Sequence, residues 1–257
     1  MTSFGRFALP DGSVIYARID GADLAVLAAP PWQGVRESCR RVPLAGARAL
    51  CPVAPSKILC IGRNYRAHAK EMGADVPAEP LLFLKAPSSL LDPEGVVRLP
   101  PESARVEHEA ELGVVIGKRG RRIALDDAMA HVFGYTAVAD VTARDLQKKD
   151  GQWSRAKGFD TFCPVGPHVV TGIDPGALAV RARVNGALRQ DGSTRDMIFP
   201  VAALVSHLSQ AMTLEPGDLI ATGTPEGVGP LVHGDVLEVE VEGVGVLRVR
   251  VEREGGA

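Results

Sequence analysis

The sequence lacks the features that mark exported and membrane-spanning proteins. Its four cysteines, Cys39, Cys51, Cys60 and Cys163, form no C-x-x-C pair and no disulfide framework. No apolar run approaches the roughly 20 residues of a membrane-spanning helix. The N-terminus has no apolar stretch of signal-peptide length. We therefore expect a cytoplasmic protein with reduced thiols and no membrane partner.

An excess of charge of either sign is also absent. The 29 Lys and Arg residues are balanced by 31 Asp and Glu residues, giving a formal net charge of -2. A nucleic-acid-binding surface needs basic residues to neutralise phosphates, so we expect no nucleic-acid partner. Apolar residues, in contrast, make up 46% of the 257 residues and are dispersed along the chain. They are sufficient for a large core without disulfides.

The first fifty residues differ from the remainder of the chain. Asp11-Gly12 separates two short apolar-containing runs, a pattern typical of a β-hairpin, because Asp-Gly adopts the positive φ angles of a tight turn. Two prolines within Cys51–Pro55 then favour an extended linker. We predict a small β-rich N-terminal region over residues 1–54 and a main domain over residues 55–257.

The main domain has the sequence pattern of a mixed fold. Ile58–Gly62 is predicted to be a buried strand, and apolar residues recur at period two over residues 112–116 and 237–241. Residues 201–212 follow the helical i, i+3, i+4 pattern after a proline. A second, shorter helix is expected to start at Asp126-Asp127. The pattern predicts an α+β fold dominated by antiparallel sheet, with few short helices.

Three acidic residues alternate along one predicted strand over residues 106–117. Because side chains alternate between the faces of a strand, Glu107, Glu109 and Glu111 are expected on one face. Their mutual repulsion needs an offsetting positive charge, which a hard cation such as Mg²⁺ or Mn²⁺ supplies through oxygen ligands. The alternative is a solvated strand edge whose charges face water.

Asp140 strengthens the metal hypothesis. It is the only charged residue in the apolar, strand-like run from Gly134 to Thr142, and an acidic side chain there is costly unless it is paired or binds a metal. Two glutamates and one aspartate leave open positions on an octahedral ion for substrate and water. This donor set indicates a catalytic metal centre.

These residues, with several ordered blocks around them, resemble the fumarylacetoacetate hydrolase family. The resemblance runs from about Lys57 to Val251. The blocks that carry it are Ile61–His68, Phe83–Ser89, Glu109–Glu111, Gly134–Gln147, Lys157–Phe162, Asn185–Gln190, Glu215–Asp218 and Thr222–Pro225. The family implies a mixed, mostly antiparallel β-roll that forms a homodimer. It also implies that Glu109, Glu111 and Asp140 hold Mg²⁺ or Mn²⁺, with Glu107 in a supporting role.

The resemblance further implies a catalytic pair formed by His68 and Glu71 on a short mobile segment. Residues three apart share one face of a helical turn, so Glu71 can orient the imidazole and favour its basic form. The alternative is an exposed charged helix with an incidental histidine. Gly73 and the prolines at positions 77 and 80 flank the segment and suit the hinges of a lid.

Four more residues are expected around the substrate. By the same resemblance Lys157 faces the metal site, where it can hold a substrate oxygen and stabilise developing negative charge. Gln147 and Thr224 are implied to contact the substrate. Arg63 stands beside the lid and is a candidate to meet a distal carboxylate, with a surface role as its alternative.

Together these expectations describe a metal-dependent enzyme that acts on a small oxo-acid. We expect C–C bond cleavage, by hydrolysis or decarboxylation, of a 2,4-dioxo or β-oxo acid through a metal-stabilised pyruvate enolate. One alternative is an enol-diene isomerase of aromatic catabolism that uses the same site. Another is a metal-stabilised binding protein without turnover.

Overall fold

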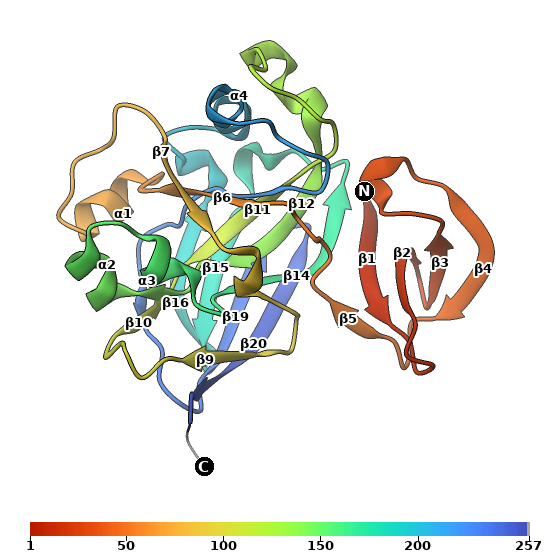
Figure 1. Cartoon of the computed structure of the whole chain (residues 1–257), viewed down its shortest axis with the longest axis horizontal. Coiled ribbons are helices and arrows are strands. Elements are labelled where there is room, and N and C mark those ends of the chain that lie inside the picture. Colours follow the sequence, from red (N-terminus) through yellow and green to blue (C-terminus); the bar gives the residue numbers. More distant parts are fainter. Residues whose placement is uncertain (256–257) are drawn as a thin grey trace.

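Twelve strands form one large, mostly antiparallel sheet in the computed structural model, which describes residues 1–255 (Figure 1). The main path of the sheet runs β4-β3-β2-β1-β14-β12-β11-β17-β6-β7, with β5 beside β1 and β8 beside β14. In chain order the strands are β1 (Thr2–Ala8), β2 (Val14–Asp20), β3 (Asp23–Leu27), β4 (Glu37–Pro43), β5 (Arg48–Leu50), β6 (Ile58–Gly62), β7 (Leu81–Lys85), β8 (Leu90–Leu91), β11 (Ala110–Ile116), β12 (Val132–Ala139), β14 (Cys163–Thr171) and β17 (Leu219–Ala221).

Two smaller sheets complete the β structure. The five-stranded sheet has the order β16-β15-β19-β20-β9 and contains β9 (Val96–Leu99), β15 (Ala179–Val184), β16 (Ala187–Ser193), β19 (Val236–Val241) and β20 (Gly245–Arg253). The three-stranded sheet has the order β13-β10-β18 and contains β10 (Val106–His108), β13 (Thr142–Ala143) and β18 (Gly229–Pro230).

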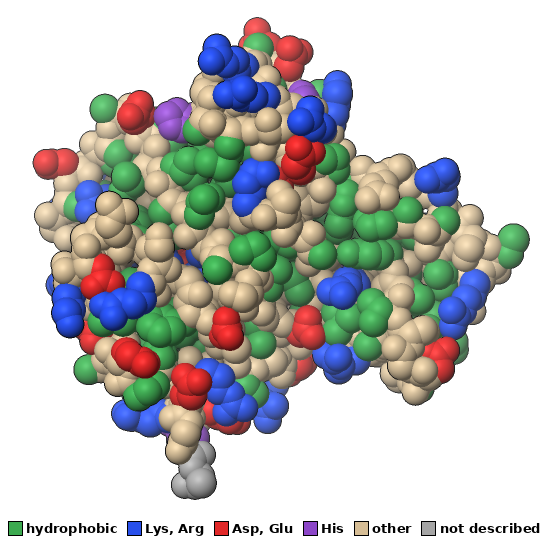
Figure 2. Space-filling model, in the orientation of Figure 1, with side chains coloured by type: hydrophobic (Ala, Val, Ile, Leu, Met, Phe, Trp, Pro, Cys, Tyr) green, Lys and Arg blue, Asp and Glu red, His purple; other side chains and the backbone are tan. Residues whose placement is uncertain are grey.

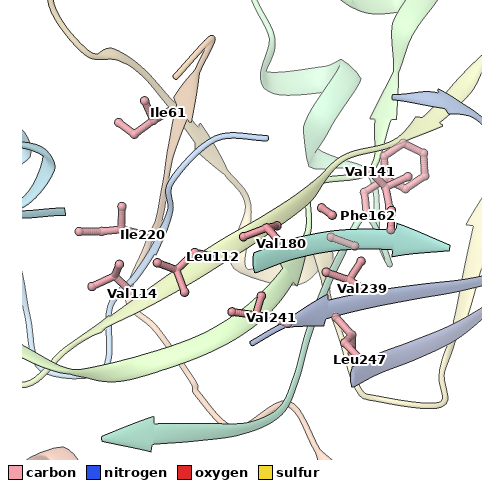
Figure 3. Packing of buried hydrophobic residues seen from close by; sticks show 14 of the residues in the cluster. Ile61, Leu112, Val114, Val141, Phe162, Val180, Ile220, Val239, Val241 and Leu247 are labelled. Atoms are coloured by element: carbon pink, nitrogen blue, oxygen red, sulfur yellow. The ribbon is translucent and has the colours of Figure 1, made fainter. Parts of the chain in front are cut away.

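The main core lies where the large and five-stranded sheets pack together. Leu112 and Val114 of β11 belong to the same buried cluster as Val180 of β15, Val239 of β19 and Leu247 of β20 (Figure 3). The five-stranded sheet shows the period-two pattern predicted for residues 237–241, because buried and half-buried residues alternate along β19. Strand β11, in contrast, is buried on both faces over its whole length. A side chain on either face of β11 is therefore shielded from water.

The helices are short and lie outside the sheets (Figure 1). The α-helices are α1 (Arg66–Glu71), α2 (Arg144–Asp150), α3 (Ser154–Gly158) and α4 (Val201–Ala211). The 3₁₀ helices are η1 (Pro31–Gln33), η2 (Pro87–Ser89), η3 (Leu125–His131), η4 (Pro175–Ala177) and η5 (Thr194–Asp196). No helix among residues 1–255 has the length and apolar character needed to cross a membrane.

Both predicted helices are present. Helix α4 follows Pro200 and buries Val201, Leu204 and Leu208 on one face, so the predicted helix is confirmed. The shorter helix expected to start at Asp126-Asp127 is present as the 3₁₀ helix η3, which starts one residue earlier at Leu125.

The N-terminal strands extend the large sheet. Strands β1 and β2 pair antiparallel around Asp11-Gly12, as expected for the hairpin. The first residues of β1 also pair with β14, from Thr2↔Thr171 to Phe4↔Val169. The observed architecture is the predicted α+β fold with mostly antiparallel sheet and few short helices.

Candidate active site

The acidic stretch does not form one strand, so the prediction of a continuous strand over residues 106–117 is wrong. Strand β10 ends at His108 and belongs to the three-stranded sheet, whereas β11 starts at Ala110 in the large sheet. Glu109 lies at the break, where its carbonyl accepts a hydrogen bond from the backbone N–H of Asp140 at 2.9 Å. The side-chain oxygen of Gln190 accepts from the N–H of Ala110 at 3.0 Å. This side-chain contact stabilises the change of sheet, which period-two alternation does not indicate.

Three carboxylates meet at this break. Glu109, Glu111 and Asp140 each place one oxygen within 4.8 Å of the others. The register accounts for the meeting, because Ala110 of β11 pairs with Ala139 of β12 and so places Asp140 beside Glu109. The three residues are at most 4% exposed, which excludes the solvated strand edge.

Two of the carboxylates are neutralised by buried cations. The Lys157 ammonium lies 2.8 Å from Glu109 Oε2 and 2.6 Å from Asp140 Oδ2. Arg144 donates from its NH2 group to Glu109 Oε1, and Lys85 Nζ donates to Asp140 Oδ1, both at 2.6 Å. Burial alone raises the pKa of Glu109, but the charges of Lys157 and Arg144 outweigh it and hold that pKa below its usual value.

Glu111 is different. Its side chain accepts one hydrogen bond, from the N–H of Gly223 at 2.8 Å, and forms no ion pair among residues 1–255. Burial, together with the neighbouring charges of Asp140 and Glu109, raises its pKa well above the usual value. Glu111 is therefore a buried carboxylate without a cation bonded to it, whereas Glu109 and Asp140 each have two.

The chemistry of this donor set fits a hard divalent ion. Mg²⁺ and Mn²⁺ prefer carboxylate oxygens, and one ion among the three side chains offsets the uncompensated charge of Glu111. Glu107 lies outside the group of three, because Arg105 and Arg144 both donate to its carboxylate at 2.6 Å. Its role is to position Arg144.

The predicted His–Glu pair lies on α1. His68 Nδ1 is 3.1 Å from Glu71 Oε2, and His68 is 5% exposed, so the exposed-helix alternative does not hold for the histidine. The second carboxylate oxygen of Glu71 accepts a hydrogen bond from the N–H of Gly227 at 3.0 Å. Glu71 therefore contacts both the imidazole and a loop outside the helix.

A cavity of about 220 Å³ is lined by both His68 and two of the three carboxylates, Glu109 and Glu111. The predicted residues that line it are Arg63, His68, Glu109, Glu111, Gln147, Lys157 and Thr224. Asp140 is fully buried behind the cavity, and Glu71 lines a second cavity of about 210 Å³. Met72, Arg144 and Lys148 line both cavities.

The structure also shows three important residues to which the sequence assigned no role: Lys85, Arg144 and Gln190. Lys85 is the one charged residue at the end of an apolar strand, a signal like that of Asp140. Arg144 follows the Asp140 run at the start of α2, and no local pattern indicates that it pairs with Glu107 and Glu109. Gln190 donates to Thr224 Oγ1 at 2.7 Å, and Thr224 in turn donates to the carbonyl of Ala110 at 2.8 Å.

Fold and pocket together define an α+β protein whose buried acidic centre is suited to a divalent ion. The chain belongs to the fumarylacetoacetate hydrolase family. Residues 57–252 match the family described as Fumarylacetoacetate (FAA) hydrolase C-terminal, and residues 3–52 match one described as Rv2993c-like, N-terminal. The resemblance seen in the sequence is confirmed.

Related proteins carry several reaction names. The chain is 48% identical to the oxaloacetate tautomerase YisK of Bacillus subtilis, over 75% of this chain and 69% of the relative. It is 43% identical to the crystal structure of 2-hydroxyhepta-2,4-diene-1,7-dioate isomerase from Mycobacterium marinum, with a TM-score of 0.92 and all of both chains covered. The chain is also 36% identical to a fumarylacetoacetate hydrolase structure from Exiguobacterium antarcticum, with a TM-score of 0.87. That match covers 99% of this chain and 100% of the other. Family members are thus enzymes that differ in the reaction they catalyse.

Proposed function

We propose that this protein is a divalent-metal-dependent enzyme that cleaves a C–C bond of a small β-oxo or 2,4-dioxo acid by decarboxylation or hydrolysis. One observation carries the proposal. The three buried carboxylates lie within 4.8 Å of one another, and two of them line the same cavity as His68, the imidazole paired with Glu71. A metal centre and a proton-transfer group facing one small cavity are the parts that such chemistry needs.

Glu109, Glu111 and Asp140 would hold Mg²⁺ or Mn²⁺. When bound, the ion supplies Lewis-acid polarisation of the oxo group and lowers the energy of negative charge on its oxygen. Lys157 adds a second positive charge on the same side of the cavity, and its ammonium is fixed by Glu109, Asp140 and the Thr142 hydroxyl. A cation held this firmly stabilises an enolate without having to reorganise.

His68 is the proposed proton-transfer residue. Glu71 accepts the hydrogen on Nδ1, which leaves Nε2 as the basic nitrogen. In hydrolysis, Nε2 takes a proton from the water that attacks the C4 carbonyl. The C3–C4 bond then breaks and its electron pair forms the enolate of pyruvate. The proton that His68 took from the water is delivered to C3, which completes pyruvate and restores the neutral imidazole. In decarboxylation carbon dioxide leaves and the same enolate forms without an attacking water.

Enol–keto tautomerisation is the second candidate. The name of the 48% identical B. subtilis relative, an oxaloacetate tautomerase, and the isomerase name of the M. marinum structure favour it. Tautomerisation uses the same proton transfer at C3 but breaks no C–C bond. The enol-diene isomerisation of aromatic catabolism belongs to the same class of reaction.

We further propose that the enzyme works as a cytoplasmic homodimer, as the family resemblance implies. Residues 55–257 form its catalytic unit in this proposal, and residues 1–54 an appended region. Light scattering after size-exclusion chromatography measures the oligomeric state directly.

A substrate panel tests the proposed function. Oxaloacetate, its enol form and acetylpyruvate are each incubated with the enzyme and Mg²⁺, Mn²⁺ or a chelator. We expect metal-dependent release of pyruvate from oxaloacetate or acetylpyruvate. Metal-dependent loss of enol absorbance without pyruvate supports the tautomerase instead. If no acid is turned over with either metal, the protein is a metal-stabilised binding protein and both enzymatic proposals are wrong.

A further inference from the structure

Tyr65 carries a buried hydroxyl that has no hydrogen-bond partner among residues 1–255. The residue is 2% exposed, so bulk water does not reach the group. Within the described residues only one other buried side-chain polar atom is in this condition, the hydroxyl of Thr136 on β12. A buried hydroxyl without a partner is costly, and such groups usually bond an ordered water. The Tyr65 hydroxyl is therefore a donor that no described protein group uses.

The chain beside Tyr65 packs against the loop that binds Glu111. The Asn64 side chain donates to the carbonyl of Thr222 at 2.7 Å. A Cβ at Gly223 would lie 2.6 Å from the Cβ of Asn64, so the two segments are in direct contact. The N–H of Gly223 in turn donates to the Glu111 carboxylate at 2.8 Å. Tyr65 therefore adjoins a residue that contacts the hydrogen-bond partner of Glu111.

Among the carboxylates near Tyr65, one is buried. Burial raises the pKa of the Tyr65 hydroxyl, and the negative charges of three nearby side chains raise it further. These side chains are Glu111, Asp196 and Glu226. Asp196 and Glu226 are exposed, so water solvates them. Glu111 is 1% exposed and accepts one hydrogen bond among residues 1–255, although a carboxylate has about four acceptor positions. Glu111 is thus the neighbour that gains most from a donated hydrogen bond.

Tyr65 approaches Glu111 from the protein interior and not from the cavity. Glu111 lines the cavity of about 220 Å³, whereas Tyr65 is not among its lining residues. The two side chains form no direct hydrogen bond. One water that accepts from the hydroxyl and donates to the carboxylate satisfies both groups, and buried waters bridge polar side chains in this way. A bridge of this kind adds a donor to Glu111 without occupying the cavity.

We propose that Tyr65 is a positioning residue for Glu111, and that its hydroxyl donates to that carboxylate through one buried water. This inference rests on the proposed function, which makes Glu111 a metal ligand. A group bonded to a ligand fixes the ligand's orientation, and its loss typically lowers metal affinity by about 10- to 100-fold. Because Tyr65 does not line the cavity, it acts on metal binding and not on the substrate.

The test variant is Tyr65→Phe, which removes the hydroxyl and keeps the ring. Calorimetric titration of the intact protein with Mn²⁺ should give a dissociation constant about 10- to 100-fold higher than that of wild type. In saturating Mn²⁺ the kcat of the variant should equal that of wild type, because the water bridge holds only the ligand. Tyr135→Phe is the matched control and should change neither quantity. Tyr135 is 4% exposed on β12, and the charged side chain near it is Asp174.

Thermal unfolding in chelator shows whether the hydroxyl is bonded. If it has no partner at all, its removal relieves a costly burial, and the variant melts above wild type. If it is bonded through water to Glu111, its removal costs a hydrogen bond, and the variant melts below wild type. We expect the second result for Tyr65→Phe. A melting temperature above that of wild type overturns the inference, whatever the metal affinity.

A crystal structure of wild type that resolves ordered water shows the bridge directly. We expect one water about 2.5–3.0 Å from both the Tyr65 hydroxyl and a Glu111 carboxylate oxygen. No water in that position, or Mn²⁺ affinity in Tyr65→Phe equal to that of wild type, contradicts the inference and leaves metal-dependent turnover of the oxo-acids unaffected. If Tyr65→Phe weakens Mn²⁺ binding as expected but no oxo-acid is turned over, the inference holds and the proposed reaction is wrong.

Discussion

The two sides of the cavity are built in different ways. On the sheet side, Glu109, Glu111 and Asp140 are positioned by the pairing of β11 with β12 and are shielded from water by the core. On the opposite side, His68 and Glu71 lie on a six-residue helix without a side-chain cap. A helix of this length is not stable alone, so its position depends on contacts such as that of Glu71 with Gly227.

The two sides of the cavity therefore have different functions, metal binding and proton transfer. The sheet side provides a preorganised donor set, which determines metal affinity. The helix side provides a proton-transfer group whose placement depends on a few local contacts. Variants on the sheet side should therefore abolish metal binding, whereas variants on the helix side should slow turnover and leave metal binding intact. Charged side chains of both signs are intermingled over the face shown in Figure 2.

The largest effect is expected from Asp140→Ala. It removes one of the three donors and leaves the ammonium groups of Lys85 and Lys157 without their shared carboxylate. We expect loss of both Mn²⁺ binding and turnover, measured by calorimetry and by pyruvate release, with the fold checked by circular dichroism. A folded variant that retains either property contradicts the ligand assignment.

His68→Ala tests the helix side. Loss of a general base should lower hydrolysis by roughly 10²–10⁴-fold. Mn²⁺ affinity should match that of wild type, because the imidazole is not among the three donors. His207→Ala, on α4, is the control and should change neither quantity. An unchanged rate for the His68 variant removes this residue from the mechanism.

Gly227→Ala tests the contact that holds the helix. A Cβ at Gly227 would lie 2.2 Å from the carbonyl oxygen of Arg189, so the loop must shift and its N–H must leave Glu71. We expect kcat to fall by about ten-fold, the cost of one charge-assisted hydrogen bond, with metal affinity unchanged. Gly234→Ala is a matched control, because Gly234 has a φ of 92° and open space around its Cβ position. Equal kcat values for the two variants contradict a role for the Glu71–Gly227 contact.

The smallest effect concerns stability and pH. Because the pKa of Glu111 is raised in the folded state, the metal-free fold binds more protons than the unfolded chain above the ordinary pKa of 4.5. Its stability therefore falls as the pH rises through the window between the ordinary and the raised pKa. Glutamine does not ionise, so Glu111→Gln removes this pH-dependent loss of folding stability. We expect the variant to have a melting temperature about 2–8 °C higher than wild type in chelator at neutral pH.

We expect Mg²⁺ to stabilise wild type, because it binds the folded state, and to give the Glu111→Gln variant no such stabilisation. Scanning calorimetry with chelator and with Mg²⁺ measures both effects. A variant that melts below wild type in chelator shows that the ionised carboxylate of Glu111 does not strain the metal-free fold.

Local patterns in the sequence predicted much of the fold. The strand Ile58–Gly62, the hairpin around Asp11-Gly12 and the helix after Pro200 each follow from the order of apolar, turn and capping residues within one segment. The helix expected at Asp126-Asp127 is also present, but a few acidic residues at a helix start do not indicate whether its bonding is i→i+3 or i→i+4, and the structure has a 3₁₀ helix there.

For the pocket, the sequence indicated which residues carry the chemistry but not how they are arranged. Alternation placed Glu107 with Glu109 and Glu111, yet the break at Glu109 separates it from the other two. That break depends on Gln190, which is 80 residues away from Ala110 along the chain. The balance of charge between Lys85 and Asp140 is likewise a contact between distant residues, and no local pattern encodes it.

The most direct test of the central claim is an anomalous difference map from a crystal soaked in Mn²⁺. We predict one peak per chain, bonded at about 2.0–2.4 Å to oxygens of Glu109, Glu111 and Asp140. A map with no peak among these three carboxylates, or with an ordered Mn²⁺ bound only elsewhere, contradicts the account.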